Sequence, residues 1–256
     1  MCDKAVYVSL VSFLTNSTTL SCCCHAGTKL VCYTAQMDPS LRAQLDRFFS
    51  GHKHRTYKKR DTLIHEGDVP NCVYYIKSGY IRLYSISKDG EELTRLIMRP
   101  GDLFPIRYAV GLQDIDYYAE TMTPVEAWQC PREDFRKFLV DHPEVLMLVS
   151  ANLLTRMGGL YKRMEYLVFG SAFEKVASIL LICGERFGKK EGSETIIQVP
   201  LTHKDIASLV GVTRETVSIE MEKLEKKKLI TCGKDRCITI HNVKALEKES
   251  LLTGSD

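Results

Sequence analysis

Residues 201–218 hold the side chains of this sequence that are best suited to one kind of chemistry, the reading of DNA bases. Thr202 can cap the start of a helix, and Asp205 is placed to complement the positive end of that helix. Gly211 supplies a tight turn, after which Thr213 can cap a second helix. Two short helices joined by a tight turn are typical of a helix-turn-helix, whose second helix enters the major groove.

The outer face of the predicted second helix carries polar side chains that suit base edges and phosphates. Arg214 can reach a guanine edge or a phosphate, and Glu215 can accept a hydrogen bond from a cytosine amino group. Threonine hydroxyls and the free amide groups at both helix starts can hold phosphates. We therefore predict that these residues contact DNA: Thr202, Lys204, Thr213, Arg214, Glu215, Thr216, Ser218, Ile219, Lys234 and Arg236.

A β-hairpin is predicted directly after this second helix. Residues 229–232 and 237–240 favour strands, with a turn between them. A winged helix-turn-helix has such a hairpin, which would place Lys234 and Arg236 near the DNA backbone. A plain helix pair within a bundle is the alternative, but it explains neither the hairpin nor an apolar Ile219 on the outer face. The three lysines that precede the hairpin are more typical of a solvated surface.

The chain before these helices divides into a β-rich part and a helical part. Residues 73–76, 80–86 and 93–98 favour strands, and turn residues recur about every ten positions between 55 and 131. This spacing predicts an antiparallel barrel or sandwich. Such a domain would lie upstream of the DNA-reading helices.

A long helix is predicted to begin at Pro143, after a short helix around residues 134–138. Its apolar stripe can seat on the barrel or pair with its copy in a dimer. Gly158 and Gly159 should weaken this helix in its middle, or allow a bend or a close helix approach. The stripe consists of Leu146, Val149, Leu153, Met157, Leu160, Met164 and Leu167.

Composition favours a globular protein of the cytoplasm. The chain has 256 residues, of which 45% are hydrophobic and 26% charged, and its formal net charge is +3. With so small a net charge, any DNA contact must come from the local placement of charge. No apolar run reaches the roughly 18 residues that cross a membrane. The run at 5–14 is interrupted by serines and makes a poor signal peptide.

Five short motifs occur in an order that is specific to one family. They are Val-Tyr-Tyr-Ile-Lys-Ser-Gly (73–79), Gly-Asp-Leu-Phe (101–104), Pro-Arg-Glu-Asp-Phe (131–135), Thr-Arg-Glu-Thr-Val-Ser (213–218) and Leu-Glu-Lys-Lys-Lys-Leu-Ile (224–230). Through them, the chain resembles the Crp/Fnr family of transcription regulators over residues 40–243. The resemblance implies a homodimer that binds double-stranded DNA at a near-palindromic site and contacts RNA polymerase. It implies no enzymatic activity.

The resemblance also implies an α+β fold. An N-terminal antiparallel β-roll of the jelly-roll kind is expected, then a long dimerisation helix, then a C-terminal winged helix-turn-helix. The predicted domains are a poorly ordered extension (1–36), a cyclic-nucleotide-binding-like β-roll (37–142), a dimerisation helix (143–170), a winged helix-turn-helix (171–243) and a C-terminal tail (244–256). A signal at the roll or along the dimer helix would reposition the recognition helices.

The effector site departs from that of the cyclic-AMP-binding members of this family. Those members have a Gly-Glu after the phenylalanine and an Arg-Ser some ten residues later, which grip the ribose and the phosphate. Here Phe104 is followed by Pro-Ile-Arg, and Asp116 near the later position would repel a phosphate. Arg107 is the only nearby cation in the sequence. We therefore expect no cyclic-AMP binding; Phe104, Arg107, Tyr117 and Tyr118 either line another effector pocket or fill the roll.

A second departure is Ile219, because many relatives carry an arginine there that reads a guanine. An isoleucine can contact only apolar groups such as a thymine methyl. The usual half-site of the family therefore cannot be assumed for this chain.

Ten cysteines raise the question of a metal or redox centre. Some relatives hold an iron–sulfur cluster through N-terminal cysteines, and the candidate ligands here are Cys22, Cys24, Cys32 and Cys130. No Cys-x-x-Cys is present, so we expect no cofactor. A redox, iron–sulfur or other small-molecule sensor that controls DNA binding is the alternative function. An enzyme on a cupin-like roll would need clustered histidine and carboxylate ligands, which the strands lack.

Overall fold

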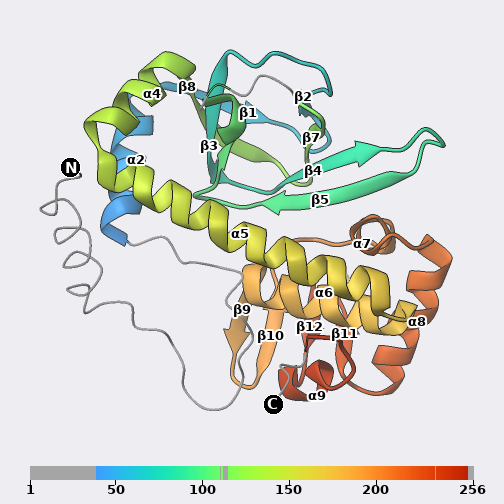
Figure 1. Cartoon of the computed structure of the whole chain (residues 1–256). Helices are drawn as coiled ribbons and strands as arrows, with labels where there is room; N and C mark the ends of the chain where they lie inside the picture. Colours follow the sequence, from blue (N-terminus) through green and yellow to red (C-terminus); the bar gives the residue numbers. More distant parts are fainter. Residues whose placement is uncertain (1–38, 110, 112–114, 234, 253–256) are drawn as a thin grey trace, which may run out of the picture. The chain divides into compact units, whose positions relative to one another are not determined.

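Two four-stranded antiparallel sheets form the β-rich part of the chain (Figure 1). The computed structural model describes residues 39–109, 111, 115–233 and 235–252. The strands of this part are β1 (Lys53–Tyr57), β2 (Thr62–Ile64), β3 (Cys72–Ser78), β4 (Ile81–Ile86), β5 (Glu92–Met98), β6 (Leu103–Phe104), β7 (Tyr118–Thr121) and β8 (Val125–Pro131). One sheet has the order β1-β8-β3-β6 and the other β2-β7-β4-β5. The predicted α+β class with an N-terminal antiparallel roll is confirmed.

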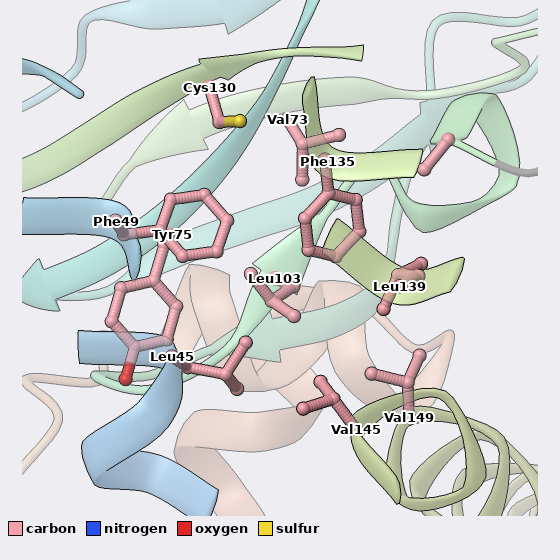
Figure 2. Close-up of a cluster of buried hydrophobic side chains, with 11 residues drawn as sticks. Leu45, Phe49, Val73, Tyr75, Leu103, Cys130, Phe135, Leu139, Val145 and Val149 are labelled. Carbon is pink, nitrogen blue, oxygen red and sulfur yellow. The ribbon is translucent and has the colours of Figure 1, made fainter. Parts of the chain in front are cut away.

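Strand β3 contributes to two apolar clusters, because successive side chains of a strand point to opposite faces. Tyr74 and Ile76 point between the two sheets, whereas Val73 and Tyr75 point toward helices. These helices are α2 (Pro39–Ser50), α4 (Arg132–Asp141) and α5 (Pro143–Phe169). Figure 2 shows the cluster on the helix side, which contains Val73 and Tyr75. In it the ring of Tyr75 stacks on that of Phe49 with centroids 4.9 Å apart. A one-residue slip of β3 would exchange the two sets of side chains.

Helix α5 is continuous over 27 residues and has Pro143 at its first turn. The Gly158–Gly159 pair does not interrupt it, although glycine is a poor helix former. A Cβ added to Gly158 would meet open space, so no close contact in the described chain requires glycine there. One further short helix, α3 (Ile106–Ala109), follows β6 in the chain.

The C-terminal part combines helices with a third sheet. It contains α6 (Ala172–Phe187), β9 (Gly188–Glu191), β10 (Glu194–Ile197), α7 (His203–Val210), α8 (Arg214–Lys226), β11 (Ile230–Cys232), β12 (Ile238–Ile240) and α9 (Val243–Glu247). The strand order is β11-β12-β10-β9. Ser171 caps α6 in a capping box with Glu174, which fixes where that helix begins.

Two features of this part differ from the expectations drawn from the sequence. Strands β9 and β10 were not predicted, because β9 is exposed at all its residues and carries no apolar alternation. The segment predicted as a tail from residue 244 contains most of α9. Leu246 and Leu252 are buried there, and the amide of Leu251 donates to the hydroxyl of Ser178 in α6. Among the described residues, none of the helices combines the length and the apolar character that a membrane span requires.

Candidate nucleic-acid interface

The first helix of the predicted pair, α7, begins and ends where the sequence places its signals. The backbone N–H of Asp205 donates to the hydroxyl of Thr202 at 3.1 Å, and the backbone N–H of Thr202 donates to the Asp205 carboxylate at 2.8 Å. This reciprocal pair is a capping box. Gly211 ends the helix with φ 67° and ψ 41°, a left-handed conformation that glycine adopts without steric cost. The turn between the two helices is therefore fixed by local sequence.

The second helix, α8, is capped by Thr213, whose hydroxyl accepts a hydrogen bond from the amide of Thr216 at 3.2 Å. Its inner face is formed by Val217, Met221 and Leu224, all of which are almost completely buried. These apolar side chains recur at three- and four-residue steps, which gives one stripe toward the core. Rotation of α8 about its axis is thereby fixed, so its outer face is fixed as well.

Three of the exposed side chains of α8 are Arg214, Glu215 and Ile219. Ile219 is 54% exposed, which is unusual for isoleucine, and Arg214 and Glu215 are exposed too. Neither Arg214 nor Glu215 forms a hydrogen bond or ion pair with another described residue. Ser218 lies beside them and shares a hydrogen bond with His203 Nδ1 at 2.7 Å. The outer face of α8 thus offers one donor, one acceptor and one apolar group that the fold does not use.

The predicted wing is present as the β11–β12 hairpin, with Ile230 opposite Ile240. The backbone of its turn is held by a hydrogen bond from the amide of Gly233 to the carbonyl of Cys237 at 2.8 Å. Arg236 follows in a left-handed conformation, and its carbonyl accepts a hydrogen bond from Leu201, just before α7. Lys234, the other predicted wing contact, lies outside the described residues.

Basic side chains gather where the wing meets the two helices. A cavity of about 460 Å³ there is lined in part by Arg214, Arg236, Lys204 and Arg60, the last from the turn between β1 and β2. Sequence reasoning missed Arg60, because it lies far from the helix-turn-helix in the sequence. Such a concentration of cations suits phosphates.

Several of the predicted DNA contacts have partners within the protein, among them Thr202 and Lys204. The Thr202 hydroxyl is engaged by Asp205, to which it donates at 2.6 Å. Lys204 forms an ion pair with Glu92 of β5 at 3.1 Å. Burial raises the pKa of the Glu92 carboxyl. The hydrogen bonds and positive charges of Arg82 and Lys204 together lower it by a larger amount, so the pKa lies below its usual value. Glu92 is therefore charged at neutral pH.

Two family models match separate parts of this chain. A cyclic nucleotide-binding domain matches residues 54–142, and a Crp-like helix-turn-helix domain matches residues 174–249. The global nitrogen regulator of Synechocystis sp. (strain ATCC 27184 / PCC 6803 / Kazusa) is 30% identical over 196 residues, which cover 76% of this chain and 87% of that regulator. The chain belongs to the Crp/Fnr family of transcription regulators. As a Crp/Fnr protein it is a DNA-binding transcription regulator, as the sequence analysis predicts.

Solved Crp/Fnr structures agree with this fold. FixK2 from Bradyrhizobium japonicum superposes with a TM-score of 0.70 at 21% identity, over 80% of this chain and 99% of FixK2. TTHA1359, a Crp/Fnr transcriptional regulator from Thermus thermophilus, superposes with a TM-score of 0.63 at 25% identity, over 79% of this chain and 100% of that one. The helix-turn-helix module identified above therefore sits in the fold typical of Crp/Fnr regulators.

Two of the three aromatic residues suggested for an effector pocket, Phe104 and Tyr118, pack against neighbouring rings, whereas Tyr117 lines a cavity. Phe104 is buried and stacks on Tyr74 with centroids 5.0 Å apart. Tyr117 is buried in the cluster between the sheets, and Tyr118 stacks on Tyr84 at 5.3 Å. Of the two roles suggested for them, filling of the roll fits Phe104 and Tyr118 better than lining of a pocket does.

The charges near this site differ from the expectation. Asp116 does not stand alone as a repelling charge, because Arg95 donates to it at 2.9 Å and Arg107 at 3.2 Å. Burial raises the pKa of the Asp116 carboxyl, but Arg95 and Arg107, together with a backbone hydrogen bond, lower it by more, so the pKa falls below its usual value. Arg107 is also not the only nearby cation. It lines a cavity together with four other arginines, which the sequence scatters over distant segments: Arg95, Arg156, Arg163 and Arg186.

The apolar stripe of α5 is covered at its start and open along most of its length. Val145 and Val149 are buried against the roll. Farther along, large apolar side chains are exposed, including Leu154 at 68% and Phe169 at 78%. The other exposed apolar residues of this helix are Leu146, Met147, Leu153, Met157, Leu160, Tyr161, Met164 and Val168. So long an exposed apolar surface on one helix is typical of an interface with another chain.

Of the four candidate cysteine ligands, Cys130 lies among the residues that the structure describes. Cys22, Cys24 and Cys32 lie outside the described residues. Cys130 is fully buried among apolar side chains, and burial raises the pKa of its thiol to about 12. No group of three or more histidine, cysteine or acidic side chains in the described chain is placed to hold a metal ion.

Proposed function

We propose that this Crp/Fnr regulator binds a near-palindromic DNA site as a homodimer, paired along α5. The exposed apolar surface of α5 supports this, because two copies packed along it would remove that surface from water. A twofold axis along α5 would present two copies of α8 to successive major grooves. Half-sites would then lie about 34 Å apart.

Base reading is assigned to the three free side chains of α8. Arg214 is placed for a guanine edge, Glu215 for a cytosine amino group and Ile219 for a thymine methyl. Phosphate contacts are assigned to the amide groups at both helix starts, to Thr213 and Thr216, and to Arg236 of the wing. The observation that carries this assignment is that Arg214 and Glu215 have no partner among the described residues.

A selection experiment tests this proposal. The purified full chain would be used to select duplexes from a random pool, in parallel with an Arg214→Ala variant. We expect the wild-type protein to select a site with two inverted half-sites, and the variant to lose preference at one symmetric pair of positions. Identical selected sites for both proteins would contradict the role of Arg214.

We also propose where this regulator acts and what it interacts with. We assign it to the cytoplasm, where its DNA is accessible, with RNA polymerase as a protein partner and a small-molecule signal as the input. We assign it no catalytic activity. These assignments follow from its membership of a family of transcription regulators.

We propose in addition that the regulator works without an iron–sulfur cluster. Thiolates bind iron, and the buried Cys130 resists ionisation. Protein purified without oxygen, from Met1 and separately from Met37, should be colourless and iron-free in both forms. Iron with visible absorbance in the Met1 form alone would instead favour the redox or iron–sulfur sensor.

A further inference from the structure

The imidazole of His203 links the two helices of the helix-turn-helix. His203 is the first residue of α7, and its Nδ1 shares a hydrogen bond of 2.7 Å with the hydroxyl of Ser218 in α8. Both residues are half-buried. Nε2, the other ring nitrogen, has no hydrogen-bond partner among the described residues. Because the bond joins two helices, it holds the Ser218 hydroxyl in one place.

The Ser218 hydroxyl belongs to the face of α8 that is assigned to base reading. Ser218 comes four residues after Arg214 and three after Glu215, and side chains at these spacings are neighbours on a helix surface. Ile219, which is 54% exposed, is the next residue. Apart from the bond to His203, the hydroxyl has no hydrogen-bond partner in the described chain. Its remaining hydrogen-bonding capacity is therefore available to a base.

The protonation of the imidazole decides whether the hydroxyl offers a donor or an acceptor. A neutral ring with its proton on Nε2 accepts at Nδ1, so Ser218 donates to it and only the hydroxyl lone pairs are left. A ring with protons on both nitrogens donates from Nδ1, and the hydroxyl hydrogen of Ser218 is then free. The first state suits the amino group of adenine or cytosine. The second suits the oxygen of thymine or guanine.

His203 lines the cavity of about 460 Å³ beside the wing. The other charged or titratable groups of the described lining come from the β1–β2 turn, α7, α8 and the wing: Arg60, Lys204, Arg214, Cys232 and Arg236. Arginine and lysine ordinarily keep their charge near neutral pH, where histidine changes its own. Burial, together with the neighbouring Glu225 carboxylate, raises the pKa of Cys232 to about 12. Within this lining, a change between about pH 6 and pH 8 therefore acts mainly on His203.

We propose that His203 is a positioning residue for base reading, whose protonation state sets whether the Ser218 hydroxyl accepts a hydrogen bond from a base or donates one to it. The proposal rests on the proposed function, in which the outer face of α8 reads DNA. At about pH 8 the base that Ser218 faces is preferably one with an amino group, and at about pH 6 one with an oxygen. The base preference at one symmetric pair of positions thus changes with pH.

One test needs no DNA. The full chain, labelled with nitrogen-15 in its histidines, would be followed by NMR from about pH 5.5 to pH 8.5. Ring nitrogens with and without a proton differ in chemical shift, and His203→Asn identifies the His203 signals. We expect a proton on Nε2 alone at high pH and on both nitrogens at low pH. A proton on Nδ1 at every pH, or a ring that does not titrate, would overturn the proposal.

The second test measures base preference. Site selection with Ser218→Ala would first identify the position at which this variant no longer discriminates. Wild-type affinities at about pH 6 and pH 8 would then be compared for duplexes that differ at this position in one half-site. We expect the affinity ratio between the base with an amino group and the base with an oxygen to change about fivefold, the factor that one hydrogen bond contributes.

Two variants show whether this change comes from His203. In His203→Asn the amide does not titrate, so we expect the same affinity ratio at both pH values. His65→Asn is the matched control, because His65 pairs with Asp68 in the turn between β2 and β3 at 3.5 Å. It should keep the pH dependence of the wild type.

The outcomes separate the two proposals. If Ser218→Ala leaves the selected site unchanged, Ser218 reads no base and the role of His203 is wrong. A wild-type ratio that is equal at both pH values, or an equal pH dependence in His203→Asn, would refute that role as well. If the wild-type protein selects no DNA site, the proposed function fails, whereas the NMR titration still decides whether the His203 ring switches between accepting from and donating to Ser218.

Discussion

Arginine has two different surroundings in two regions of this molecule. On α8, Arg214 is exposed and has no partner among the described residues. In the cavity against α5, Arg163 and Arg186 are surrounded by the fold and donate to backbone carbonyls. No contact in the described part of the fold uses the Arg214 guanidinium, so it is available to an external partner. A half-buried arginine that donates to carbonyls of several elements holds those elements together.

The role of Arg214 on α8 could be predicted from the sequence, whereas the grouping of arginines in the cavity against α5 could not. The helix-turn-helix could be predicted because its signals are local: Thr202 and Asp205 form a capping box, Gly211 makes the turn and Thr213 caps the next helix. The cavity arginines come from separate strands and helices, so only the tertiary fold brings them together. The ion pair between Lys204 and Glu92 was missed for the same reason.

The largest effect expected from this comparison is on stability. Arg163→Met removes three hydrogen bonds to backbone carbonyls, and we expect it to lower the free energy of unfolding by about 2–3 kcal/mol. Denaturant unfolding would measure this. Arg214→Ala is the control, with an expected change within about 0.5 kcal/mol because it is a surface residue. Equal losses in both variants would break the distinction between the two regions.

An effect of intermediate size is expected on base reading. Arg214→Ala should weaken binding to the selected site by about 1–3 kcal/mol and relax its specificity. Competition between the selected site and a scrambled duplex would measure both changes. Lys226→Ala is the matched control, because its ammonium lies on the same helix and is paired with Glu222 at 2.7 Å. An equal loss on all sequences would show that Arg214 contacts phosphate and reads no base.

The smallest effect is expected at the wing. Arg236→Ala should weaken binding about equally on every sequence, and should reduce the slope of log affinity against log salt concentration by about 0.9. Affinities at several salt concentrations would measure this slope. A loss confined to the selected site would mean that Arg236 belongs with Arg214 as a base-reading residue.

Much of the remaining fold was also predictable, and the exceptions have physical causes. The turns and strands between residues 55 and 131 follow alternation and glycine placement, and the long helix follows its apolar stripe. Strands β9 and β10 escaped prediction because they are short and β9 is wholly exposed. The filling of the roll by Phe104 depends on the facing ring of Tyr74, which the sequence does not place.

The most direct test of a dimer that reads DNA through α8 is a hydroxyl-radical footprint on the selected site. We expect two protected patches related by a twofold axis and centred about 34 Å apart, at one helical turn. In Leu154→Glu, a charge on the exposed face of α5 should prevent pairing and remove both patches together. A single protected patch, or a footprint that Leu154→Glu leaves unchanged, would contradict the dimer paired along α5.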